Sequence, residues 1–551
     1  MAVRPARSPR ENAHPAFYRS ETFKWLDLHK ILKTLNSPAP ETEIRDRDKE
    51  RSWPGPAQYW LLIIAFLYLY LNLFAFPNIP IYLDGDQTFF WEYALRMLHG
   101  ERVYRDFFQF TPPGTDIYYL AFFKLFGARL WVINFSVLLL GIALCWICFS
   151  IARRLMTENQ ALLASALFLV LPFNTLLDAT HHWFSLLAVL GAVRILMPSR
   201  TPPRIALAGV FLGAASFFTQ TAGAAGLLAL LLFLAWEGFC TKKTWRAILG
   251  YQSLLVAAFA LTLAALSAYL LVKVGWKQLW YFQVVYPRHY LIYREEGVLW
   301  QLTQRPTRSG LAGYLERRFV YALLFLMYPV ALWRSWRERR NPRSLELALL
   351  ALAGLFLFFE VLPRANWTRI YAVSMPALIL FVWALSRRGM RRSLTMAMWI
   401  ILFCLAAEKV LSRHRQNHLI ARLPAGKAAL SRQKYEEFSW LMQHTKPGDL
   451  FFQANWLNVY PPFELRTPAF VDALTSNEVT RPEFVALTIR QLESRHVEYI
   501  LWAQGLGIPE NPDRPWENHL GPLRAYLESH YRRVQLLPGP ELSYDEVWQR
   551  R

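Results

Sequence analysis

Apolar segments recur along most of the chain, and polar stretches separate them. Each apolar segment is close to the ~20 residues that an α-helix needs to cross a ~30 Å hydrocarbon core. Eleven such segments occur, at residues 57–77, 129–151, 160–178, 181–197, 204–221, 222–238, 247–274, 318–333, 345–362, 370–386 and 393–408. This pattern predicts an α-helical polytopic membrane protein with about eleven transmembrane helices.

The polar stretches divide the chain into an N-terminal tail (1–56), a membrane region (57–411) and a C-terminal segment of soluble composition (412–551). Helical and strand-like patterns alternate in the C-terminal segment, so we expect a small α/β domain there. Its predicted helices cover 434–444 and 482–495, and its predicted strands cover 450–453 and 497–502.

Two of the polar loops in the membrane region are long. The first, 78–128, has apolar residues at helical spacing from Asp86 to Leu98, and Gly100 follows. A second helix is expected at 115–126, and both helices suit the membrane surface because they are amphipathic and rich in aromatic residues. In the second long loop, 275–317, aromatic residues alternate with Arg, which fits either an interfacial aromatic belt or a lipid-phosphate site.

The net charge of +21 is concentrated in alternate short loops. Residues 57–411 carry 33 basic and 16 acidic side chains. The basic residues cluster at Arg153-Arg154, Arg200 and Arg204, Lys242 to Arg246, Arg334 to Arg343, and Arg387 to Arg392. This positive-inside pattern places the N-terminus in the cytoplasm and the segment 412–551 on the opposite side of the membrane. We therefore expect these basic residues to interact with the lipid bilayer and not with nucleic acid.

Acidic residues gather in the first long loop. Six lie between residues 84 and 116: Asp84, Asp86, Glu92, Glu101, Asp106 and Asp116. Carboxylates beside a membrane span are costly unless they face water or do chemistry. The cluster therefore predicts an active site on the outer face of the membrane.

The same loop carries the residues of a family resemblance. Asp86 is followed by Met97-Leu98 and Gly100, then by Tyr104 to Phe108 and Pro112-Pro113-Gly114. In this respect the chain resembles the GT-C glycosyltransferases, in particular the bacterial protein O-mannosyltransferase-like and lipid A aminoarabinose transferase-like families. The sequence departs from their pattern at Gln87, where Glu is usual, at Phe90, where Tyr is usual, and at Thr111, where many relatives have Lys.

The resemblance implies a bacterial inner-membrane enzyme that moves a sugar from a polyprenyl-phosphate donor to a lipid, glycan or protein acceptor. Asp86 matches the spacing of the family's general base, which removes the proton of the attacking hydroxyl in an inverting transfer. Asp84 is the rival, and a helix-capping role is the alternative for either residue. Asp84-Gly85-Asp86 also reads as D-x-D, which leaves a divalent metal open, although polyprenyl-phosphate donors in this family generally need none, so we expect no cofactor.

The leaving phosphate needs cations and hydrogen-bond donors. Candidates at outward positions are His181, His182, Arg288, His289, Arg294, Arg364 and Arg369, and the Tyr104–Phe108 motif adds Arg105 and Asp106. The competing interpretation of each cation is an interfacial anchor with no part in catalysis.

Two other functions remain open from the sequence. A flippase of lipid-linked sugars would show internal repeats and broken, polar helices at the membrane midplane, whereas the spans here are almost free of charge. A non-catalytic scaffold with an exterior recognition domain would leave the acid cluster at 84–116 unexplained. The sugar, the acceptor and the oligomeric state do not follow from the sequence.

Overall fold

The computed structural model describes residues 56–290, 310–339, 341–364, 366–387, 392–454, 457–472, 474, 480–503, 506, 520–538 and 544–551. The chain divides into two compact units, Met1–Trp53 with Arg387–Gly389, and Pro54–Ser386 with Met390–Arg551. All that follows concerns the second unit. The predicted tail, apart from Pro56, lies outside the described residues, as does Arg294.

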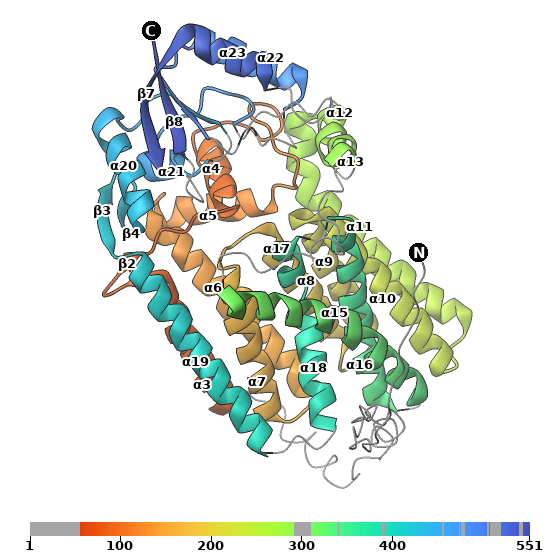
Figure 1. The fold of residues 1–551 in the computed structure, drawn as a ribbon. Helices are drawn as coiled ribbons and strands as arrows, with labels where there is room; N and C mark the ends of the chain where they lie inside the picture. Colours follow the sequence, from red (N-terminus) through yellow and green to blue (C-terminus); the bar gives the residue numbers. More distant parts are fainter. Residues whose placement is uncertain are drawn as a thin grey trace, which may run out of the picture. The chain divides into compact units, whose positions relative to one another are not determined.

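Every predicted apolar segment contains a helix (Figure 1), although 57–77 ends in a strand, 160–178 ends in a loop and 370–386 is interrupted before Met375. The helices are α3 (Pro56–Leu73), α6 (Leu130–Leu155), α7 (Glu158–Phe168) with its π-helical extension η1 (Leu169–Phe173), α8 (His181–Leu196), α9 (Pro202–Phe218), α10 (Gln220–Cys240), α11 (Trp245–Val274), α15 (Gly310–Arg337), α16 (Pro342–Val361), α18 (Met375–Arg387) and α19 (Arg392–Gln416). Within the described ranges, seven are long and apolar enough to cross a membrane, namely α3, α6, α10, α11, α15, α16 and α19. The other four are shorter, so the chain is a helical multi-pass membrane protein in which a count of eleven spans stays a prediction.

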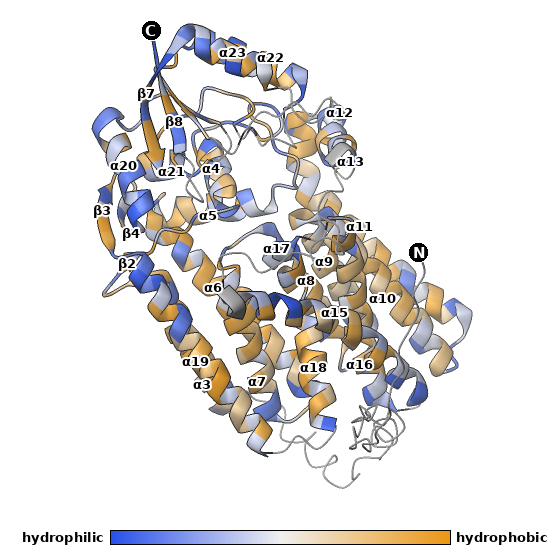
Figure 2. Cartoon of the chain, viewed as in Figure 1, coloured by the Kyte–Doolittle hydropathy of each residue, from blue (hydrophilic) through white to orange (hydrophobic). Residues whose placement is uncertain are grey.

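The outermost helices present apolar side chains outward. In α11 only 11% of the most apolar stretch is buried, and in α19 only 6%. Leu261, Val272 and Phe403 are more than two-thirds exposed, and Figure 2 shows both helices as predominantly hydrophobic. Apolar surface of this extent on a long helix is typical of contact with lipid.

The first long loop folds as its spacing predicts. After a short hairpin of β1 (Phe74–Ala75) and β2 (Ile79–Pro80), it forms α4 (Gln87–Leu98) and α5 (Gly114–Phe126). Gly100, just beyond α4, has a φ of +93°, a backbone conformation that glycine adopts without strain. The prediction of two helices in this loop is therefore confirmed, and their position along the membrane surface stays a prediction.

The second long loop begins with α12 (Trp276–Trp280), η2 (Tyr281–Val285) and α13 (Tyr286–Tyr290). The ring of Phe108 lies 5.5 Å from that of Phe282 and 4.9 Å from that of Tyr286. Phe484 of the C-terminal segment packs on Phe108 at 5.3 Å. These aromatic residues therefore join the two long loops to the C-terminal segment, while Trp276 and Trp280 stay exposed.

The C-terminal segment has mixed α/β structure. An antiparallel hairpin, β3 (Leu419–Leu423) and β4 (Gly426–Leu430), leads into α20 (Arg432–His444). The main sheet has the order β5 (Phe451–Ala454), β6 (Tyr499–Trp502), β8 (Tyr544–Arg550), β7 (Tyr531–Pro538), with β5 and β6 parallel and the other pairs antiparallel. The helices of this segment are α21 (Tyr460–Phe463), α22 (Pro482–Ser494) and α23 (Gly521–His530). The predicted helices and the predicted strands β5 and β6 are confirmed; β3, β4, β7 and β8 were not predicted.

Contacts with the first long loop begin at the hairpin. Ile81 forms a bridge with Ala429 of β4, and the backbone N–H of Tyr82 donates to the carbonyl of Ala429 at 2.9 Å. The stretch that leads to α4 is thus hydrogen-bonded to the C-terminal segment.

Candidate active site

The start of α4 holds the two aspartates of the D-x-D sequence in different surroundings. The carbonyl of Gly85 accepts hydrogen bonds from the backbone N–H of Thr88 at 3.0 Å and from its hydroxyl at 2.8 Å. Asp86 stands at the N-cap position, but its side chain makes no capping hydrogen bond, and the residue is exposed. Thr88 therefore closes the local turn, and the Asp86 carboxylate does not serve as the helix cap.

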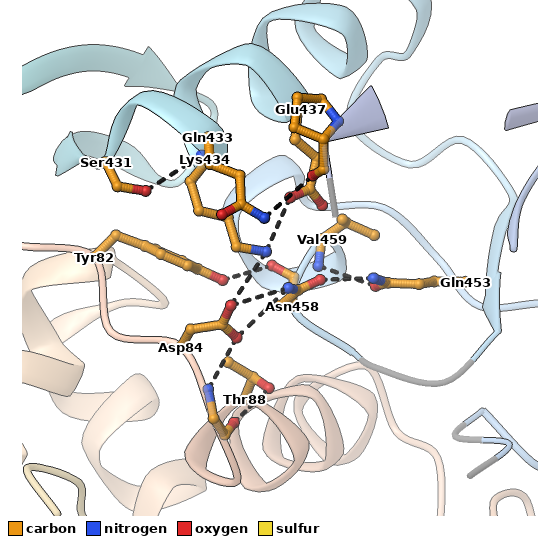
Figure 3. Close-up of polar contacts among 12 residues, drawn as sticks. Tyr82, Asp84, Thr88, Ser431, Gln433, Lys434, Glu437, Gln453, Asn458 and Val459 are labelled. Atoms are coloured by element: carbon orange, nitrogen blue, oxygen red, sulfur yellow. Dashed lines mark hydrogen bonds and ion pairs between the residues drawn. The ribbon is translucent and has the colours of Figure 1, made fainter. Parts of the chain in front are cut away.

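Asp84 points toward the C-terminal segment (Figure 3). Its carboxylate forms an ion pair with Lys434 of α20 at 3.1 Å and accepts from the side-chain amide of Asn458 at 3.3 Å. Lys434 also pairs with Glu437 at 2.9 Å. Burial acts to lower the pKa of Lys434, but the carboxylates of Glu437 and Asp84 outweigh it, so this pKa is raised and the amine is firmly charged.

Beside Asp86 lies a second acid, Asp178, in the loop between η1 and α8. Asp178 is buried, and its Oδ1 accepts from the hydroxyl of Thr180 at 3.1 Å. Burial and, after it, the charge of Asp86 raise the pKa of Asp178 well above its usual range. A buried carboxyl group whose pKa is raised by burial and by a neighbouring charge is a candidate functional residue. Sequence reasoning did not select Asp178, although it precedes the His181-His182 pair.

The two histidines begin α8 next to this pair of acids. Their rings are 3.9 Å apart between centroids, and the ring of Phe90 from α4 packs on His181 at 5.3 Å. Arg369, on the short helix α17 (Trp367–Ala372), interacts electrostatically with both histidines. The structure thus brings three of the predicted phosphate ligands, His181, His182 and Arg369, together with the N-terminal end of α4.

Other predicted ligands lie elsewhere or outside the description. Arg105 is exposed, and within the described part of the chain its charged partner is its neighbour Asp106, at 3.8 Å. The Asp106 carboxylate accepts from the backbone N–H of Arg102 at 2.8 Å and so closes a local turn. Arg288 is exposed on α13. The side chains of His289 and of Arg364, at the end of η3 (Leu362–Arg364), lie outside the described residues, as does Arg294.

A second group of acids is buried around Arg96, on the last turn of α4. The Arg96 guanidinium pairs with Glu101 at 2.7 Å and with Asp472 at 2.9 Å. Burial, opposed by Arg96, raises the pKa of Asp472 to about 6 and that of Glu92 to about 8. Asp116 is fully buried, and burial raises its pKa well above the usual range. Of the six acids of the loop, Glu92 and Asp116 are therefore buried, Glu101 is partly exposed and paired with Arg96, Asp106 closes a turn, Asp84 is ion-paired and Asp86 is exposed.

Metal ligation was left open by the D-x-D sequence. Over the described ranges, no group of three or more His, Cys, Asp or Glu side chains is arranged to hold a metal ion.

Comparison with known proteins gives both a family match and a fold match. Residues 111–282 match the family model described as dolichyl-phosphate-mannose-protein mannosyltransferase. A search among curated proteins found no match. The fold is similar to that of ArnT from Cupriavidus metallidurans, solved bound to undecaprenyl phosphate, with 12% identity over 89% of this chain and 97% of that chain and a TM-score of 0.54.

The apo structure of the same ArnT gives 13% identity, 90% and 98% coverage and a TM-score of 0.54. The oligosaccharyltransferase of Archaeoglobus fulgidus, solved with Zn and sulfate, is similar at 13% identity over 88% of this chain and 72% of that chain, with a TM-score of 0.49. Residues 111–282 are thus similar to this mannosyltransferase family, and the chain as a whole shares its fold with ArnT.

Proposed function

We propose that this enzyme transfers a sugar from a polyprenyl-phosphate donor to a hydroxyl acceptor on the periplasmic face of the bacterial inner membrane, with Asp86 as general base. The observation that carries the proposal is the position of an exposed Asp86 near the buried Asp178, the imidazole rings of His181 and His182 and the guanidinium of Arg369, all at one end of the helices. The undecaprenyl phosphate bound by ArnT of Cupriavidus metallidurans supports a lipid-phosphate donor.

The reaction needs one carboxylate and, at the leaving phosphate, a cation and hydrogen-bond donors. The acceptor oxygen attacks the anomeric carbon, its proton passes to Asp86, and the bond from that carbon to the phosphate oxygen breaks. Attack opposite the leaving group inverts the anomeric centre. The departing polyprenyl phosphate is already charged, so Arg369 and the histidines stabilise it without a proton transfer.

Asp178 takes a different role from Asp86. Its raised pKa favours the protonated carboxylic acid, which can donate a hydrogen bond from its hydroxyl while Oδ1 accepts from Thr180. Such a donor suits a sugar hydroxyl or the acceptor oxygen before attack.

The proposed orientation follows the charge distribution. Arg154 at the end of α6 pairs with Glu346 at the start of α16, and Arg200 and Lys243, in the loops before α9 and after α10, both pair with Glu237 at the end of α10. We assign these ends to the cytoplasm, because basic loop residues stay on that side. The C-terminal segment then lies in the periplasm.

The test is sugar transfer in membranes that contain the wild type, Asp86→Asn or Asp84→Asn, supplied with pooled radiolabelled polyprenyl-phosphate sugars. We expect Asp86→Asn to lower transfer by roughly 10²–10⁴-fold, the usual contribution of a general base, while Asp84→Asn keeps measurable transfer. The labelled product then identifies the acceptor class.

Two results would contradict the proposal. If Asp84→Asn alone abolishes transfer, Asp84 is the base and Asp86 is not. If the wild type moves labelled lipid across the bilayer and never transfers sugar, the chain is a flippase.

A further inference from the structure

The helix that carries Asp86 is held at both ends by the C-terminal segment. At its start, Asp84 pairs with Lys434 at 3.1 Å and accepts from Asn458 at 3.3 Å. At its end, Arg96 pairs with Asp472 at 2.9 Å and donates to the carbonyl of Ala469 at 3.2 Å. These partners lie more than 330 residues further along the chain, so only the folded structure creates the contacts.

The contact at the end of α4 is a buried anchor. The Arg96 side chain is 8% exposed and that of Asp472 is 1% exposed. The guanidinium also lies 4.8 Å from the ring centre of Phe107 and donates to the carbonyl of Asp106 at 3.2 Å. Removing one partner of such a pair leaves an uncompensated buried charge, so this end serves the stability of the fold.

The contact at the start of α4 is more open. The Asp84 side chain is 43% exposed and that of Lys434 is 19% exposed. An ion pair this exposed contributes little to stability. The ion pair instead fixes the course of the backbone at the start of α4. The Asp84 carboxylate also accepts from the backbone N–H of Gly85 at 2.9 Å, and Gly85 is the residue between Asp84 and Asp86.

The far side of this contact is itself braced (Figure 3). The Asn458 side-chain oxygen accepts from the amide of Gln453 at 2.7 Å, and the Asn458 carbonyl accepts from the hydroxyl of Tyr82 at 2.8 Å. Gln453 is part of β5, and Lys434 is part of α20. The Asp84 carboxylate is therefore contacted by Lys434 of α20 and by Asn458 of the loop before α21, and Gln453 of β5 supports Asn458.

We propose that Lys434 and Asn458 are positioning residues, which act through Asp84 to hold Asp86 at the start of α4 in its reactive place. This inference rests on the proposed role of Asp86. It assigns to the C-terminal segment a part in the chemical step, because a displacement of a reacting group by about 1 Å costs on the order of 10²-fold in rate.

The experiment compares three variants of the full-length protein in detergent micelles. Lys434→Met removes the cation, Lys434→Arg keeps it, and Glu437→Gln removes the other partner of Lys434 while leaving Asp84 paired. We expect Lys434→Met to lower kcat by about 10- to 100-fold, with the donor KM and the melting temperature nearly unchanged. Lys434→Arg should restore kcat, and Glu437→Gln should match the wild type.

Hydrogen exchange of the backbone amides of residues 85–98 provides a second readout that does not depend on sugar transfer. Faster exchange at the start of α4, but not at its end, is expected in Lys434→Met and not in Glu437→Gln. If exchange is unchanged in Lys434→Met, the positioning role is wrong. If Glu437→Gln loses kcat as strongly as Lys434→Met, the effect belongs to α20 and the inference fails.

The two readouts also separate this inference from the proposed function. If the wild type transfers sugar from none of the donors, the proposed function is wrong. The exchange data then still show whether the contact between Asp84 and Lys434 holds α4. An unchanged kcat in Lys434→Met, beside a loss in Asp86→Asn, overturns the positioning role alone.

Discussion

At the scale of single residues, burial decides what each acid of the first long loop does. Glu92 and Asp116 are packed inside the protein, where a carboxyl group holds its proton more strongly. Asp86 is exposed at the start of a helix and lies close enough to Asp178 to raise the pKa of that group. Acidic side chains within a short stretch of sequence therefore differ in how strongly they hold a proton and in what they contact.

The proposed phosphate site predicts a difference between two arginines. Arg369→Ala should raise the donor KM by roughly tenfold or more, because a charge-assisted contact to phosphate is lost, and Arg369→Lys should recover part of it. Arg105→Ala should leave the donor KM within about twofold, since Arg105 is exposed and its charged partner among the described residues is Asp106. Steady-state kinetics with varied donor concentration measure both. If both alanine variants raise the donor KM equally, Arg105 also contacts the donor and the prediction is wrong.

Glu92 gives a prediction about stability and pH. Its pKa is about 8 in the folded protein and 4.5 for an ordinary Glu side chain. Between these values the unfolded chain binds fewer protons than the folded one, so the stability of the wild type falls as pH rises. Glu92→Gln should remove this loss, and its melting temperature should exceed that of the wild type by on the order of a few degrees above pH 8 and by little near pH 5.

Thermal unfolding in detergent across pH 5 to 9 checks the prediction. A residual slope is expected near pH 6, where Asp472 titrates. Parallel curves for variant and wild type would show that Glu92 does not hold a proton in the folded protein.

At the scale of elements, the spacing of apolar residues was sufficient for α4 and α5 and for the membrane helices. It did not reveal β3 and β4 or β7 and β8. Strand β7 is exposed at five successive positions, Arg532 to Leu536, so it lacks the alternation that marks a half-buried strand. Its pairing with β8 is set by register across the sheet, which a local pattern does not contain.

The close approach of α5 to α9 predicts the effect of one substitution. A Cβ on Gly114 would lie 2.5 Å from the carbonyl oxygen of Phe217 at the end of α9. Gly114→Ala should therefore destabilise the protein by about 1–3 kcal/mol, as overpacking does. Gly250→Ala, in α11 with no atom within 4 Å of the new Cβ, is the matched control. It should leave the melting temperature unchanged or slightly higher, because Ala favours a helix over Gly by about 1 kcal/mol.

At the scale of the whole molecule, the charge distribution predicts the orientation in the membrane. Single cysteines at the exposed positions Lys446 and Arg246, in a background with Cys404→Ser and Cys240→Ser, should react on opposite sides. A membrane-impermeant thiol reagent added to spheroplasts should label Lys446→Cys, and Arg246→Cys only after lysis. Labelling of Arg246→Cys in intact spheroplasts would reverse the proposed orientation.

The sequence by itself determined the helical membrane architecture, the two helices of the first long loop and the resemblance to GT-C enzymes. These features follow from local periodicity, from charge placement and from a motif within about 45 residues, all of which are readable along the chain. Only the tertiary structure decided which acids are buried, which cations meet Asp86 and why Asp84 and Asp86 differ. The reason is physical: burial, ion pairing and the resulting pKa values depend on groups such as Lys434, Asp472 and Arg369, which folding brings from distant parts of the chain.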